Sequence, residues 1–167
     1  QTIGASLGQE SLKKAVYAGA LGTLAVIIFM LAYYRKFGIF SAIALIIYII
    51  LTAAIFKLLI TMTLAGIAGY ILSIGMAVDA NILIFERTKE EIKKGLLKVS
   101  AIEEGFRRAW PSIRDSNVST IITSVILYEF TSSFVRGLAL TLFIGVLISM
   151  FSAITVTRLL LRTFMKK

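Results

Sequence analysis

The stretch LAGIAGYILSIGMAVDANILIF, residues 64–85, decides the fold of this chain. It carries a single charged side chain, Asp79, in a segment as long as the roughly 20 residues that an α-helix needs to cross a bilayer. An ionisable group inside such a span costs a few kcal/mol, so it usually marks a proton or ion pathway or has a buried partner. The stretch therefore predicts a membrane helix with a functional carboxylate.

Composition extends this prediction to the whole chain. Of its 167 residues, 58% are hydrophobic, and they fall into blocks of membrane-spanning length. A soluble domain has about 45–50% apolar residues, so we expect an all-α integral membrane protein in contact with the lipid bilayer. There is no cysteine or histidine, which excludes disulfides and the usual Cys/His metal or catalytic sites. We therefore expect no metal, no cofactor other than the proton as coupling ion, and no enzymatic activity.

The basic residues predict the orientation of the chain in the membrane rather than nucleic-acid binding. The net charge is +9, but the 18 Lys and Arg residues lie between and after the apolar blocks. Four of them fall on one side of the predicted membrane and fourteen on the other, and the richer side is cytoplasmic by the positive-inside rule. This places the outer segment 1–14 outside and the basic tail 158–167 inside. The five predicted spans are residues 15–34, 37–56, 64–85, 117–134 and 137–157.

An outside N-terminus implies that something carries it across the membrane. The first span has no cleavable signal character before it. We therefore expect the chain to be the C-terminal part of a longer protein with at least one earlier span.

The inner linker, residues 87–116, is the long connection of the chain. Within it, Ser100 and Glu103 form a capping-box pattern that predicts a helix start, and Pro111 predicts a break or a new helix start. The intervening apolar residues recur at helical spacing. Two interpretations remain open: an amphipathic cytoplasmic helix on the membrane surface, or a linker helix packed under the bundle.

Small residues at every fourth position predict two close helix contacts. In lipid, such positions let helices approach one another, because packing replaces the hydrophobic driving force. In the third span, Gly75 lies one turn before Asp79 and predicts a close neighbour beside the carboxylate. The residues predicted to pack are Gly69 and Gly75 in the third span and Gly137, Thr141, Gly145 and Ser149 in the fifth.

The candidate proton relay consists of Asp79, Asn81, Asn117 and Thr120. Asn117 and Thr120 share one face of the fourth span and could hydrogen-bond Asp79 or Asn81, or line a water path. The alternative is that these groups satisfy carbonyls within their own helix. No Lys or Arg lies at the depth of Asp79, so a basic partner must come from another subunit. Asp79 itself suits proton coupling, although a permanently protonated carboxyl between helices is the structural alternative.

The sequence resembles the SecD family, the larger membrane subunits of SecDF protein-export complexes in the resistance-nodulation-division superfamily. The resemblance covers nearly the whole chain, with several motifs in the family's order. GMAVDAN carries the DAN that separates SecD from its sister SecF, whose stretch reads more like NDT. The matching segments are residues 4–8, 29–38, 63–91, 101–110, 113–128 and 136–158.

The resemblance implies that the five spans are the second to sixth of a six-span bundle. It also implies a prokaryotic cytoplasmic membrane, and as partners a SecF-like subunit, the Sec translocation channel and a preprotein substrate. Asp79 would be the family's proton-relay carboxylate, using the proton motive force to promote translocation. The alternatives are an exporter of small molecules or lipids from the same superfamily, and a purely structural subunit.

Overall fold

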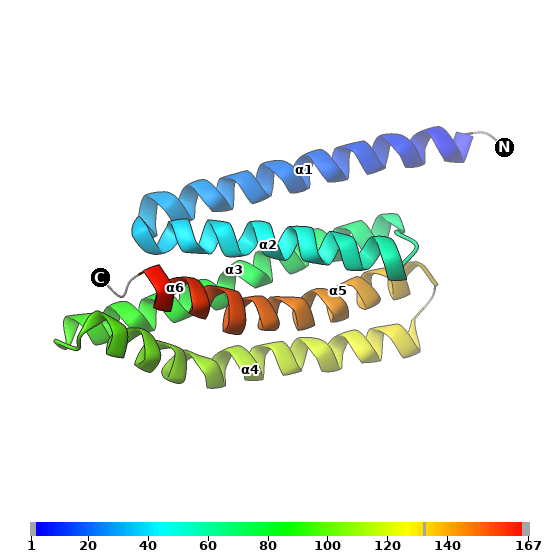
Figure 1. Cartoon of the computed structure of the whole chain (residues 1–167). Helices are drawn as coiled ribbons and strands as arrows, with labels where there is room; N and C mark the ends of the chain where they lie inside the picture. The colour runs from blue at the N-terminus through cyan, green and yellow to red at the C-terminus, as the bar shows by residue number, and fades with distance from the viewer. Residues whose placement is uncertain (1–2, 132, 165–167) are drawn as a thin grey trace.

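The computed structural model of the chain describes residues 3–131 and 133–164, and within these ranges it contains helices and no strand. The predicted all-α fold is thus confirmed for the described part of the chain (Figure 1). The elements are α1 (Ile3–Tyr34), α2 (Lys36–Leu59), α3 (Leu64–Lys93), α4 (Lys98–Phe130), α5 (Ser133–Phe151), the π-helix η1 (Ser152–Thr157) and α6 (Arg158–Phe164).

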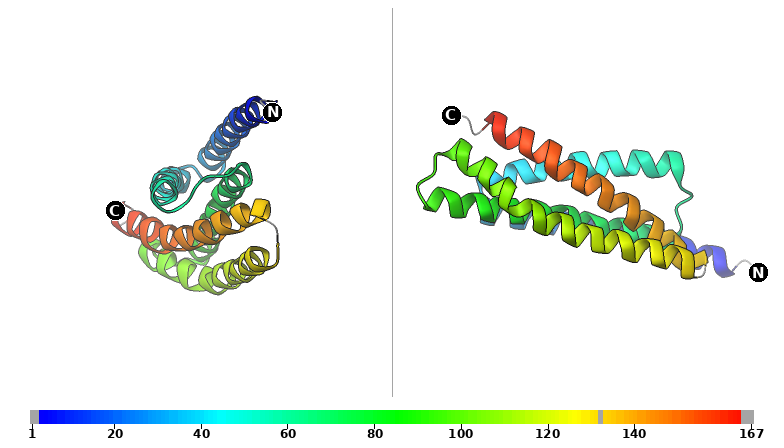
Figure 2. Two further views of the ribbon diagram at one scale, coloured as in Figure 1. Left: turned by 90° about the vertical axis from the view of Figure 1, so that its right-hand side faces the viewer. Right: turned by 90° about the horizontal axis from the view of Figure 1, so that it is seen from below.

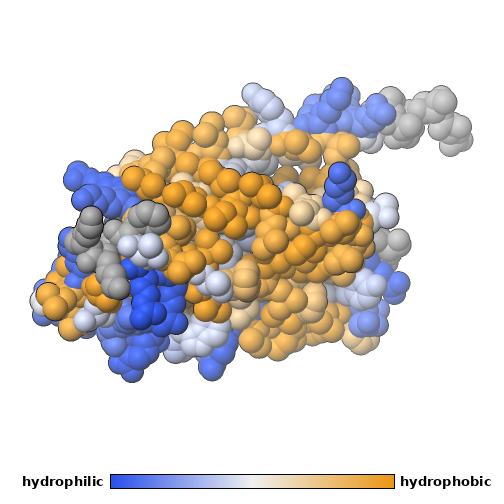
Figure 3. Space-filling view, viewed as in Figure 1, coloured by the Kyte–Doolittle hydropathy of each residue, from blue (hydrophilic) through white to orange (hydrophobic). Residues whose placement is uncertain are grey.

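Successive long helices run in alternating directions, with α3 beside α4 and α5, and α1 on the outside of the bundle (Figures 1 and 2). Figure 3 shows an apolar surface along the bundle, with hydrophilic side chains gathered at its ends. Four helical stretches in the described residues are long and apolar enough to cross a membrane, and they contain four of the predicted spans. These stretches are Gly8–Tyr34, Lys36–Leu59, Leu64–Lys93 and Val135–Thr163.

The remaining predicted span, the fourth in chain order at residues 117–134, corresponds to the second half of α4. This part is helical as far as Phe130, but α4 is more polar than the other four stretches. Ser132 lies outside the described residues. A fifth crossing therefore stays a prediction, supported by the position of α4 alongside α3 and α5 (Figure 1).

The inner linker differs from the prediction, because almost all of it is helical. α3 continues to Lys93, a short turn contains Gly95 at φ +94°, and α4 begins at Lys98 without a side-chain cap. The predicted capping box at Ser100 is therefore wrong. Pro111 lies inside α4 and neither breaks nor starts it. Since Pro111 is exposed, the carbonyl that loses its N–H partner can be satisfied by water.

The first half of α4 is packed against the inner end of α3. Its apolar face is buried at Ile102, Ala109 and Ile113. A Cβ on Gly105 would overlap Thr88 of α3, so the two backbones lie very close together. Of the two interpretations of the linker, packing against the bundle describes this segment, and a separate amphipathic helix is wrong because α4 is continuous.

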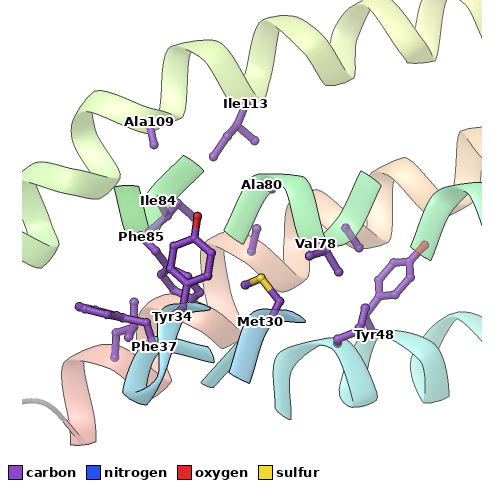
Figure 4. Close-up of a cluster of buried hydrophobic side chains, with 14 of the residues drawn as sticks. Met30, Tyr34, Phe37, Tyr48, Val78, Ala80, Ile84, Phe85, Ala109 and Ile113 are labelled. Atoms are coloured by element: carbon purple, nitrogen blue, oxygen red, sulfur yellow. The ribbon is translucent and has the colours of Figure 1, made fainter. Parts of the chain in front are cut away.

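An aromatic cluster joins α1, α2 and α3 near the inner turn between α1 and α2. The ring of Phe85 lies 5.7 Å from that of Tyr34 and 5.4 Å from that of Phe37, centroid to centroid. Phe85 is fully buried, and Figure 4 shows these rings together beside Met30. Aromatic pairs at such separations add to the stabilisation from apolar burial. The cluster therefore fixes the part of α3 that follows Asp79.

Helices α3 and α5 interlock through glycines placed opposite hydroxyl side chains. Thr63, the N-cap of α3, lies opposite Gly137, and Thr141 lies opposite Gly69. The third pair is Ser73 and Gly145, and the Ser73 hydroxyl also accepts a 2.7 Å hydrogen bond from Tyr48. A Cβ on any of these three glycines would overlap the opposing side chain. Gly69, Gly137, Thr141 and Gly145, which the sequence predicts to pack, all lie at this contact.

The two remaining packing predictions have different outcomes. Ser149 is buried and donates to the Val146 carbonyl of its own helix, 2.9 Å away. Gly75 has no atom within 4 Å of the position that a Cβ would take. The helices of this chain therefore leave the face of α3 that carries Gly75 uncovered, and its packing role stays a prediction.

The interlocked glycines predict a specific sensitivity to added side-chain volume. Gly69→Ala should destabilise the protein by about 1–3 kcal/mol, the usual cost of overpacking, because the new methyl meets Thr141 and the Leu138 carbonyl. Thermal unfolding of the purified full-length parent in detergent measures this loss. Gly22→Ala is the matched control, since the space around Gly22 is open. Equal unfolding temperatures for the two variants would contradict the predicted contact.

Candidate functional site

Asp79 lies in the interior of α3, on a face that the other helices of this chain leave uncovered. Its side chain is exposed, as are the residues Leu72 and Gly75 on the preceding turns. Within the described part of the chain, the Asp79 carboxylate has no hydrogen bond or ion pair. That a basic partner, where there is one, comes from another subunit stays a prediction. The prediction that protein surrounds α3 holds only if another chain covers this face.

The Asp79 carboxylate lies at a cavity of about 230 Å³ between α3 and α4. This volume is sufficient for several water molecules. The α3 side contributes the carboxylate among apolar groups, and the α4 side contributes an amide and two hydroxyls. The lining residues are Met76, Asp79, Ala80, Leu83, Ile113, Ser116, Asn117 and Thr120. The cavity can therefore bring water to a carboxylate within an apolar span.

Asn117 and Thr120 line this cavity but do not bond Asp79. Asn117 Nδ2 donates to the Ile113 carbonyl at 2.8 Å, and Thr120 Oγ1 donates to the Ser116 carbonyl at 3.1 Å. Both groups thus satisfy carbonyls of α4, which was one of the two alternatives from the sequence. Their remaining acceptor positions can face the cavity, because a donating hydroxyl or amide also accepts.

Asn81 does not join this cavity. It follows Asp79 by two residues, about 200° around the helix, and is buried on the other side of α3. Its Oδ1 accepts a 2.8 Å hydrogen bond from Thr157 Oγ1, at the end of η1. The prediction grouped Asn81 with Asn117 and Thr120, but the structure places Asn81 away from the cavity that these two residues line.

Three ion pairs near the turn between α3 and α4 could not be inferred from the sequence. Arg108 of α4 reaches Glu90 at 2.8 Å and the buried Glu91 at 2.5 Å, both on α3. Glu103 of α4 pairs with Arg158 of α6. The partners are far apart along the chain, so no local spacing indicates them. Together these pairs link α4 to α3 and α6 at this end of the bundle.

Comparison with known proteins identifies the family. All 167 residues match the family model described as "Protein export membrane protein SecD/SecF, C-terminal". The chain belongs to the SecD/SecF family. Among its relatives, the protein translocase subunit SecD of Thermobaculum terrenum is 54% identical over 166 residues, covering 96% of this chain and 32% of the relative. The SecD subunit of Synechocystis is 54% identical over 162 residues, covering 96% and 34%.

Solved structures support the same assignment. The crystal structure of SecDF, a translocon-associated membrane protein from Thermus thermophilus, matches with a TM-score of 0.88 and 37% identity. The match covers 92% of this chain and 22% of that one. A second SecDF structure, in the super-membrane-facing form, matches with a TM-score of 0.86. The chain spans about a third of the SecD relatives above, and its resemblance to the SecD side of the family is confirmed.

Proposed function

We propose that the chain forms the membrane part of a SecD-type subunit that uses the proton motive force to promote preprotein translocation. The single observation that carries this proposal is Asp79, an unpaired carboxylate inside an apolar helix, beside a cavity with polar groups on its opposite wall. A charge that crosses 100 mV of membrane potential is worth about 2.3 kcal/mol, enough to drive a change of helix packing.

In this mechanism Asp79 gains a proton from the outer side and releases it to the inner side. Asn117 and Thr120 order water at the carboxylate, because they line the same cavity. Neutralising Asp79 removes a charge from the uncovered face of α3 and changes which packing of that face is preferred. In the full-length parent, an outer domain that moves with α3 would pull or hold the emerging polypeptide.

The uncovered face of α3 fits a SecF-like partner that covers Asp79 and supplies a basic group. The proposed setting is the cytoplasmic membrane of a prokaryote, with residues 1–14 outside, residues 158–167 inside, and α4 as a fifth crossing. Further partners are the Sec translocation channel and the preprotein. A purely structural role is less well supported, because Asp79 forms no interhelical hydrogen bond within the described residues.

The test is preprotein export into membrane vesicles with an imposed proton gradient. The full-length parent and its Asp79→Asn variant are compared, each with its partner subunit. Loss of the gradient-dependent component in an assembled variant supports the proposal. Export equal to the parent's would assign the proton path elsewhere.

A further inference from the structure

The last membrane-crossing stretch contains a π-helical segment, η1, between α5 and α6. Well under 1% of residues in globular proteins are in π-helices, and π segments inside α-helices often occur at functional sites. One face of η1 is buried: Ser152, Ala153 and Thr157 are each at most 4% exposed, whereas Thr155 is exposed. Because this face of η1 packs in the core of the bundle, we looked for contacts that depend on the π geometry.

The first and last residues of η1 hydrogen-bond to other helices. In α4, the hydroxyls of Ser119, Thr120 and Thr123 donate to carbonyls four residues earlier in the same helix. Ser152 Oγ instead donates to the Ala44 carbonyl of α2 at 3.4 Å, and Thr157 Oγ1 donates to Asn81 Oδ1 of α3 at 2.8 Å. The π segment thus directs two hydroxyls away from their own backbone and toward α2 and α3.

The π geometry is what aligns Thr157 with Asn81. Each residue of an α-helix adds a rotation of about 100° and a rise of 1.5 Å. A π-helix has a wider turn than an α-helix. If η1 became α-helical, the chain beyond it would therefore rotate by about the 100° that one residue adds. Thr157 would then leave Asn81, and Arg158 would leave Glu103. The π segment therefore holds both contacts in register.

We propose that the Asn81–Thr157 hydrogen bond, aligned by η1, fixes the rotation of α3 so that Asp79 faces its cavity. Asp79 and Asn81 lie about 200° apart on one rigid helix, so holding Asn81 on one side sets the direction of Asp79 on the other. Thr157 is thereby a positioning residue for the proton relay, acting through α3 without touching Asp79. The expected effect on proton transfer rests on the relay function proposed above, whereas the orientation of Asp79 rests only on the hydrogen bond and the helix geometry.

The test measures the protonation of Asp79 directly. A hydrophobic carbodiimide, which reacts with protonated carboxyl groups in apolar surroundings, is applied to the full-length parent with its partner subunit at a series of pH values. The fraction of Asp79 modified is read by mass spectrometry, with Asp79→Asn as the blank. Thr157→Val keeps the side-chain shape and removes the hydroxyl, whereas Thr157→Ser keeps the hydroxyl. Thr141→Val is the matched control, since Thr141 is equally buried on α5 but bonds its own helix.

We expect Thr157→Val to move the half-labelling pH by up to about one unit and to lower gradient-driven export by up to about tenfold, because the loss of one buried hydrogen bond sets the upper limit of the effect passed on to Asp79. Thr157→Ser and Thr141→Val should label as the parent does. Asn81→Ala removes the same bond from the other side, so it should give the same shift, and the double variant no larger one. This second variant keeps the test decisive if Thr157→Val does not assemble.

An unchanged labelling profile in Thr157→Val or Asn81→Ala would overturn the positioning role. An equal shift in Thr141→Val would overturn it as well, because it would assign the effect to any buried hydroxyl. If Asp79→Asn retains gradient-driven export while Thr157→Val shifts the labelling, the relay function fails and the positioning role stands.

Discussion

Replacing Asp79 with asparagine is expected to remove the gradient-dependent part of preprotein export while leaving the complex assembled. Asparagine is close in size to aspartate and polar, but it cannot bind and release a proton. One charge crossing 100 mV is worth about 2.3 kcal/mol, so the stimulation by the gradient should fall by as much as about 50-fold. Export measured in vesicles without a gradient should stay at the parental level.

Two further variants separate coupling from structure. Asp79→Glu keeps a titratable group and should retain part of the stimulation, with a changed pH dependence. Asp79→Leu matches Asp79→Asn in lacking a proton site, so it should also lose the stimulation. If Asp79→Asn exported normally and only Asp79→Leu failed to assemble, Asp79 would be structural. The exposed position of Asp79, without a bond in the described residues, argues against that outcome.

The sequence predicted the helices and one helix contact well, because both depend on local patterns. Apolar blocks of about 20 residues have few ways to satisfy their backbone in lipid other than as helices. The four-residue spacing from Gly137 to Gly145 predicted a packing seam, since glycine at helical spacing admits a close neighbour, and the structure places that seam against α3. The cavity residues Asn117 and Thr120 were found because they are polar in an apolar context.

The errors and the open points concern features that depend on tertiary packing. Gly75 has the same spacing as a packing glycine, but the arrangement of the other helices leaves it uncovered within this chain. Pro111 is compatible with a continuous helix because the face that carries it is exposed. Asn81 was grouped with Asp79 through the family motif, although 200° of helix rotation separates their side chains. Its partner Thr157 follows a π segment that no periodicity indicates.

Filling the space beside Gly75 is expected to abolish association with the SecF-like partner. Gly75→Trp introduces a large side chain one turn from Asp79, where the helices of this chain leave open space. Packing between membrane helices depends on close backbone approach at small residues, so a tryptophan on the contact face should separate the two surfaces. Co-purification of the partner with the full-length parent should fall more than about tenfold, the effect of 1.4 kcal/mol or more.

The matched control is Gly22→Trp on α1, another glycine with no neighbouring atom within 4 Å. It places the same side chain on α1, the outer helix of the bundle, and should leave the partner bound. Gradient-driven export should fall with the partner in Gly75→Trp and persist in Gly22→Trp. If Gly75→Trp retained its partner, the Asp79 face would contact lipid, and the carboxylate would then need water from its cavity rather than a basic group from a second chain.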